Sequence, residues 1–199
     1  DGYYCQTIFM GEHTGAHVDA PAHQVSAMMD STIETYPADY ICGRAVVYNL
    51  GSLNAKPGQR ITADQILALE EGMSVKAEAE DIVLLNYGWF RYWTLGGDWK
   101  YYAKNEPGLS QDAVKLFADR GVRAVGSDTI ACDTPVIAGE EMESYAHHMY
   151  WLPNHILIIE ELRNLDQLPE ECYFVATPLK IKNGSGSPIR PFALVPRQT

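Results

Sequence analysis

The amino-acid sequence predicts a single mixed α/β domain. The chain has 199 residues, of which 46% are hydrophobic and 21% charged, and this composition suits one well-buried globular core. Short apolar runs typical of strands alternate along the chain with segments of helical spacing. Since no internal repeat, low-complexity tract or linker interrupts this alternation, we expect one domain over residues 1–199.

The first half of the chain indicates strands and one well-marked helix. Residues 3–10 and 44–50 are rich in β-branched, aromatic and apolar side chains and are bounded by glycines, which is typical of strands. Residues 62–65 have the sequence of a capping box, and apolar residues follow at helical spacing until Gly72. Residues 81–86 then contain a short apolar run that predicts a buried strand.

The second half continues the alternation. Apolar residues at helical spacing predict a helix from Ser110 to Gly121, and residues 122–125 resume as a strand. The Gly/Ser-rich segment 183–187 is the stretch that we expect to be flexible. Three further apolar runs predict strands, the last at a sheet edge because prolines are tolerated there: 156–159, 173–179 and 188–195.

The charge and cysteine patterns exclude several classes of partner. A net charge of −11 and a pI near 4.9 argue against nucleic acid and against an anionic membrane surface, both of which need clustered Lys and Arg. The sequence has no 18-residue apolar run, no signal-peptide pattern and no Cys-x-x-Cys pair, and we therefore expect a cytoplasmic protein with reduced thiols. The chain begins at Asp1 without an initiator methionine, so we expect that residues upstream of it are missing.

The six histidines of the chain fall into two clusters, which is the strongest functional signal. The first cluster places three imidazoles and the carboxylate of Asp19 within the eleven residues from His13 to His23. Neutral imidazole together with carboxylate suits Zn²⁺ or Mn²⁺, so this composition predicts a metal site. The clusters are His13, His17 and His23, and His147, His148 and His155.

The spacing in the first cluster requires a bent backbone. Its four polar side chains have odd numbers and share one face of an extended chain, but a straight strand would spread them over about 33 Å. Gly15 and Pro21 are the natural places for bends, with His17 and Asp19 as the central pair. Since the same Gly and Pro would interrupt a helix, we prefer strand and loop to a helical metal motif. His155 leads directly into an apolar run, and we expect it to be structural.

Aromatic residues crowd between positions 89 and 102. They could form a pocket wall for a planar aryl substrate, with Trp89 and Trp93 as the contacts. They could equally form core or a dimer interface, where such residues are also enriched. The sequence leaves both interpretations open.

The segment from His13 to His23 resembles the His-x-Gly-Thr-His-x-Asp-x-Pro-x-His signature of the cyclase family of metal-dependent hydrolases, which includes bacterial kynurenine formamidase and isatin hydrolase. The resemblance extends over most of the chain, from position 13 to about 194. It continues through Leu84 to Trp89, Val125 to Thr129 with Asp133, His148 with Glu160 to Leu165, and Gly186 to Arg190.

The resemblance implies roles for individual residues. It makes His23 the catalytic acid/base and His148 a second-site metal ligand, with His147 as the rival by one residue. Its remaining metal ligands are His13, His17, Asp19, which is able to bridge two ions, and Glu160.

The resemblance also implies a fold, an assembly and a reaction. The fold is a three-layer β/β/α arrangement, swivelling-domain-like, usually in a homodimer or higher homo-oligomer. The departures are Ala16 for the usual Thr, Asn86 and Tyr87 where Arg and Thr are frequent, and little of the family's segment before the signature. The last departure bears most on the identity of the substrate.

These residues support hydrolysis of a small aryl formamide or cyclic amide, such as N-formylkynurenine or isatin. One or two divalent cations, Zn or Mn, would lower the pKa of water from about 15.7 towards about 7. His23 would take a proton from that water and return it to the leaving nitrogen. The alternatives are a lactone or ester hydrolase, a dehydrating cyclase on the same metal site, or a binding module whose catalysis has lapsed.

Overall fold

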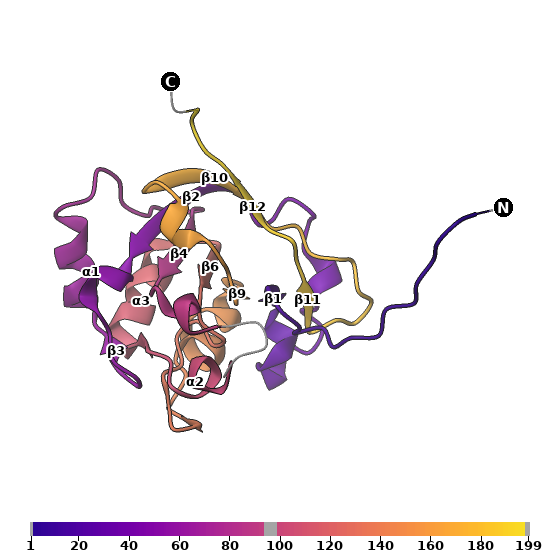
Figure 1. Cartoon of the computed structure of the whole chain (residues 1–199), viewed down its shortest axis with the longest axis horizontal. Coiled ribbons are helices and arrows are strands. Elements are labelled where there is room, and N and C mark those ends of the chain that lie inside the picture. Colours follow the sequence, from indigo (N-terminus) through magenta and orange to yellow (C-terminus); the bar gives the residue numbers. More distant parts are fainter. Residues whose placement is uncertain (1, 94–98, 198–199) are drawn as a thin grey trace.

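The computed structural model describes residues 2–93 and 99–197, and its centre is one eight-stranded sheet with helices on one face (Figure 1). The central strands β2, β4, β6 and β9 are parallel, and antiparallel strands flank them on both sides. In spatial order the strands are β11 (Gly186–Pro188), β1 (His17–Asp19), β9 (Leu157–Glu160), β6 (Ala124–Ser127), β4 (Ile82–Asn86), β2 (Cys42–Asn49), β10 (Glu171–Val175) and β12 (Phe192–Leu194).

The sheet is strongly curled because its two edges are joined by a very short link. β11 and β12 lie at opposite ends of the strand order, yet residues 189–191 alone separate them in sequence. Four Cα steps span at most about 14 Å, whereas eight flat strands would be about 34 Å across. The concave face encloses one apolar core, which includes Val18 from β1 and Phe174 from β10. The curled sheet thus supplies both β layers, and the predicted β/β/α arrangement is confirmed.

The helices form the third layer. α1 (Ala63–Glu70) connects β2 to β4, and α3 (Gln111–Arg120) connects β4 to β6. Right-handed crossovers between successive parallel strands place both helices on the same face, where they contact each other. A second apolar core, with Tyr48, Phe117 and Trp151 among its largest side chains, lies between them and the sheet.

Shorter elements surround the two main layers. No helix in residues 2–93 and 99–197 is long and apolar enough to cross a lipid bilayer. The helical turns are α2 (Trp99–Lys104), η1 (Pro21–His23), η2 (Ser26–Met28), η3 (Ile33–Thr35), η4 (Leu50–Leu53), η5 (Trp89–Tyr92), η6 (Ala146–Tyr150), η7 (Leu152–Asn154) and η8 (Leu165–Gln167). Two small ladders are formed by β3 (Arg60–Ile61) with β5 (Gly108–Leu109), and by β7 (Val136–Ile137) with β8 (Glu140–Glu141).

Most predicted elements are present, and one is wrong. The capping box at the start of α1 forms as expected, with Gln65 N donating to Thr62 Oγ1 at 3.3 Å, and Gly121 ends α3 at a φ of +72°. Residues 3–10 are not a strand: they are exposed and extend away from the body of the molecule (Figure 1). Among the described residues, no strand pairs with this segment. The predicted edge strand 188–195 contributes to both edges of the sheet.

A buried ion pair ties the two helices of the outer layer to the sheet. Arg120 on α3 donates from Nη2 to Glu70 Oε2 on α1 at 2.9 Å and from Nη1 to Glu70 Oε1. Tyr48 on β2 donates its hydroxyl to the same carboxylate at 2.6 Å. Because Glu70 is 1% exposed, its charge depends on these partners.

We expect Arg120→Ala to lower the free energy of unfolding by about 3–5 kcal/mol, because the buried Glu70 carboxylate loses both guanidinium hydrogen bonds and keeps as its cation the exposed ammonium of Lys76, 3.9 Å away. Lys115→Ala on the same helix is the matched control. Its ion pair with Asp119 is exposed, so its loss should cost about 0.5 kcal/mol or less. Urea unfolding of both variants measures the difference, and equal small losses would contradict the assignment.

Candidate metal centre and active site

The first histidine cluster is assembled by two backbone bends around β1. His17 and Asp19 lie on this strand with their side chains on one face. Gly15, at a φ of +65°, turns the chain so that His13 folds back beside them, and Pro21 opens the turn η1 after the strand. The bends therefore occur at the two expected residues.

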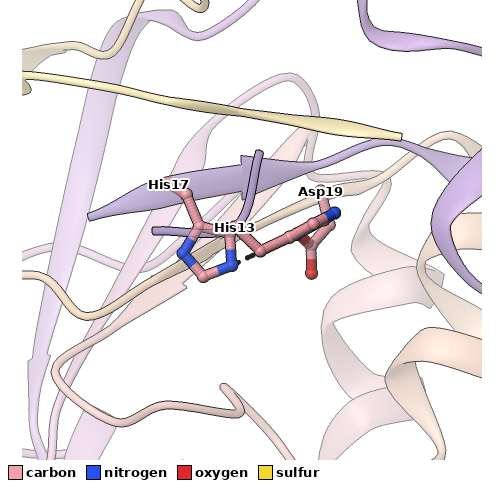
Figure 2. A group of neighbouring side chains, drawn as sticks. All are labelled: His13, His17 and Asp19. Carbon is pink, nitrogen blue, oxygen red and sulfur yellow. Dashed lines mark ion pairs between the residues drawn. The ribbon is translucent and has the colours of Figure 1, made fainter. Parts of the chain in front are cut away.

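Three ligand-type side chains from this segment converge (Figure 2). His13 Nδ1 lies 2.6 Å from Asp19 Oδ1, and His17 Nε2 lies 3.4 Å from the same oxygen. Two imidazole nitrogens and a carboxylate oxygen at such separations match the donor set of a transition-metal site.

A second group shares Asp19 with the first. Glu160, the last residue of β9, lies opposite His17 in the sheet register, and its Oε2 is 3.2 Å from His17 Nε2. His147, from the π-helical turn η6, places Nε2 3.3 Å from Glu160 Oε1 and 3.5 Å from Asp19 Oδ2. Asp19 therefore turns one oxygen to each group.

The buried polar atoms of this site fit a bound cation. In the part of the chain that the structure describes, His13 Nδ1 and both oxygens of Asp19 are buried, and their polar contacts are the close imidazole–carboxylate approaches given above rather than hydrogen bonds of regular geometry. Buried polar atoms are rarely left in this state, because desolvation without compensation costs free energy. A cation between them would satisfy all three atoms.

The electrostatics of the site support the same fit. Burial alone would lower the pKa of His17, but its hydrogen bond with Glu160 and the charges of Asp19 and Glu160 raise it to about 9. Burial alone would also lower the pKa of His147, and bonds with Asp133, Asp19 and Glu160 raise it well above its usual value. The carboxylates therefore hold protons on these imidazoles, and a divalent cation would take the place of those protons.

The structure distinguishes the adjacent histidines by their positions. His148 is exposed and belongs to neither group, whereas His147 is buried between Asp19 and Glu160. Consecutive residues of a helical turn point in directions about 100° apart, so one of them faces the site and the other does not.

In His17 and His147, the nitrogen Nδ1 contacts an oxygen atom of the protein. His17 Nδ1 lies 2.7 Å from Gly15 O, and His147 Nδ1 lies 2.9 Å from Asp133 Oδ1. Such contacts fix the tautomer and leave Nε2 as the metal-facing atom. Asp133 also accepts hydrogen bonds from the backbone N–H groups of residues 145 and 146. Sequence reasoning placed Asp133 in a motif but gave it no role, although its place in that motif was the available signal.

His23 lies beside the metal-ligand groups at a cavity of about 490 Å³. Its ring packs against that of His13, with centroids 4.0 Å apart, and its centroid is 6.4 Å from that of His147. Burial is the largest influence on His23 and lowers its pKa, and the neighbouring imidazoles add to that effect. The cavity is large enough for a small molecule. Its lining includes His23, His147, Glu160, Ala131, Met142 and Glu143.

The remaining predicted residues lie outside this centre. Trp89 is 1% exposed, donates from its indole to Tyr102 O, and belongs to the core on the helix side, so its substrate-binding prediction is corrected. Trp93 lines a different cavity, of about 480 Å³, and its role as a substrate contact stays a prediction. His155 is structural, as expected, with Nδ1 2.8 Å from the hydroxyl of Tyr36.

We expect His147→Ala to lower the bound divalent metal by one ion per chain, because the second group then loses its imidazole and keeps carboxylates alone. His148→Ala is the matched control at the next position and should keep the metal content of the unvaried protein. Elemental analysis after gel filtration measures both. Loss of metal in His148→Ala but not in His147→Ala would contradict the placement.

Comparison with known proteins agrees with this geometry. The model of the family described as "Putative cyclase" matches residues 2–134. The chain is 30% identical to isatin hydrolase of Roseibium aggregatum over 199 aligned positions, covering 96% of this chain and 74% of the relative. It is 27% identical to kynurenine formamidase of Bacillus thuringiensis, covering 92% of this chain and 76% of that protein.

A solved structure shares the fold described above. Isatin hydrolase A from Ralstonia solanacearum superimposes with a TM-score of 0.75 at 30% sequence identity, over 94% of this chain and 73% of that one. Both the sequence signature and the fold therefore lead to one assignment. The chain belongs to the cyclase family of metal-dependent hydrolases.

Proposed function

We propose that the protein is a metal-dependent amidohydrolase that cleaves the C–N bond of a small aryl formamide or cyclic amide. The observation that carries this proposal is Asp19, a buried carboxylate whose two oxygens each face imidazole nitrogens, Oδ1 at 2.6 Å from His13 Nδ1 and Oδ2 at 3.5 Å from His147 Nε2. The adjoining cavity of about 490 Å³ offers space for a small substrate. The names of the relatives, isatin hydrolase and kynurenine formamidase, support the choice of substrate class.

Two sets of side chains would hold the metal. The first consists of His13, His17 and Asp19, and the second consists of Asp19, His147 and Glu160. Mixed nitrogen and oxygen donors favour Zn²⁺ or Mn²⁺ over Ca²⁺ or Mg²⁺. A cation bound there would supply Lewis acidity toward a carbonyl oxygen and toward water.

His23 would move the proton that the reaction requires. Its lowered pKa keeps the imidazole neutral at neutral pH, so it is able to accept a proton from water. Addition of that water forms a C–O bond at the amide carbon, and His23 then returns the proton to the leaving nitrogen as the C–N bond breaks. One water is consumed, and no covalent bond to the protein is needed.

Exposed apolar side chains and free thiols bear on the assembly and the location of the protein. We propose a homodimer, because Tyr173, Phe192 and Leu194 expose apolar side chains on the neighbouring strands β10 and β12. We propose a cytoplasmic location, because Cys5, Cys42, Cys132 and Cys172 are free thiols.

The experiment that tests the function is metal analysis of the purified protein, followed by assays with N-formylkynurenine, isatin and simple lactones. We expect bound Zn or Mn, amide hydrolysis that a chelator abolishes, and recovery when the metal is restored. Full activity in chelator without bound transition metal would refute the proposal. Turnover of lactones alone would favour an ester-directed hydrolase on the same site.

We expect His23→Ala to keep its bound metal and to lower kcat by about 10²–10⁴, because a positioned acid/base contributes that much to proton transfer. Met149→Ala is the control, since Met149 is exposed and lines the same cavity. Loss of metal in His23→Ala would instead identify His23 as a ligand.

A further inference from the structure

His13 is connected to the C-terminal part of the chain by a directed series of hydrogen bonds. Its Nε2 lies 2.8 Å from Ser185 Oγ, and Ser185 Oγ lies 2.7 Å from Glu12 Oε2. Glu12 Oε2 also accepts from the backbone N–H of Ser185 at 2.8 Å. Because a carboxylate only accepts, Ser185 donates its hydroxyl hydrogen to Glu12. The hydroxyl oxygen then accepts from His13 Nε2–H, and Nδ1, which lies 2.6 Å from Asp19 Oδ1, is the nitrogen whose lone pair a metal would use.

Close packing holds the same ring from both sides. A Cβ at Gly186 would lie 2.5 Å from His13 Cε1 and 2.6 Å from Val18 O, so any larger residue there would displace the imidazole or the strand. Gly186 lies on β11 opposite Asp19 in the sheet register. On the other side of the ring lies His23, with centroids 4.0 Å apart. His13 is therefore enclosed between β11 and the proposed acid/base.

His13 needs such support more than the other ligand-type residues. His17 and Asp19 are held on a paired strand, whereas His13 lies in the bend before it and is the more exposed, at 26% of its side chain against 5% for His17. The partners of the other imidazoles, Gly15 O and Asp133, are fixed by their own local structure.

We propose that Glu12, Ser185 and Gly186 are positioning residues that select the Nε2–H tautomer of His13 and thereby present Nδ1 to the metal. The inference rests on the proposed metal-dependent function, and it adds residues from the segment 183–187 that the sequence predicts to be flexible. This segment would hold His13 in place beside His17 and Asp19.

The test uses Ser185→Ala and Glu12→Gln, each in the His147→Ala background so that Zn²⁺ binding reports the first ligand group. Competition with a chromogenic chelator should show affinity about 10- to 100-fold weaker in both variants, as is usual when the partner of a ligand is lost. Histidine ¹⁵N NMR of the metal-free protein should show a proton on His13 Nε2 in the parent. Ser185→Ala should lose this preference.

Glu34→Gln is the matched control. Glu34 accepts a hydrogen bond from the backbone of Asn183 in the same loop without contacting His13, so its variant should keep the parent affinity and tautomer. Ser185→Thr retains the hydroxyl and should restore both. Gly186→Ala should weaken Zn²⁺ binding by displacing the ring.

The outcomes separate the two proposals. Parent affinity and an unchanged tautomer in Ser185→Ala and Glu12→Gln would overturn the positioning role, even if the protein hydrolyses amides. Absence of metal binding in the unvaried protein would refute the metal-dependent function. The ¹⁵N measurement on the metal-free chain would still decide the role of Ser185 and Glu12, with an unprotonated His13 Nε2 in the parent overturning the inference.

Discussion

The buried carboxylate of Asp19 is the constraint on which the rest of the site depends. β1 is three residues long, yet it has paired strands on both sides, and this pairing fixes the direction of the Asp19 side chain. An isolated carboxylate in such a place is costly unless cations or protons compensate it. Imidazoles surround Asp19. Their hydrogen bonds and positive charge favour the ionised carboxylate and hold the pKa of Asp19 well below its usual range despite burial. The buried carboxylate of Asp19 is therefore stable only with positive charge beside it.

The sequence predicted the local part of this site because that part is local in the chain. The spacing of His17 and Asp19, together with the bends at Gly15 and Pro21, follows from strand geometry and backbone chemistry, and the structure has both bends. The helix boundaries of α1 and α3 followed in the same way from capping signals. A resemblance over most of the chain added the contribution of Glu160.

Other features depend on tertiary structure and could not be predicted from periodicity. His147 and His148 differ in sequence by one position, and the rotation of one short turn decides which of them is buried. Trp89 lies among aromatic neighbours that suit a pocket or a core equally well, and the packing of α2 against η5 decides for the core. The contact between His13 and Ser185 joins residues that are 172 positions apart, so no local sequence pattern predicts it. Residues 3–10 have strand composition without a strand to pair with, because composition specifies a pleated surface and not a partner.

The closing of the sheet through the short link between β11 and β12 determines when, during synthesis, the site can form. The segment that carries His13, His17 and Asp19 leaves the ribosome first, whereas Glu160, Ser185 and the closing strands come last. At about 5–20 residues per second, the early residues wait on the order of ten seconds for their partners. During that interval Asp19 is hydrated, and its negative charge needs no cation or proton beside it. The affinity of the centre for a cation is therefore acquired only after β9 and β11 have been made, when the curled sheet closes and the same side chains are taken out of water.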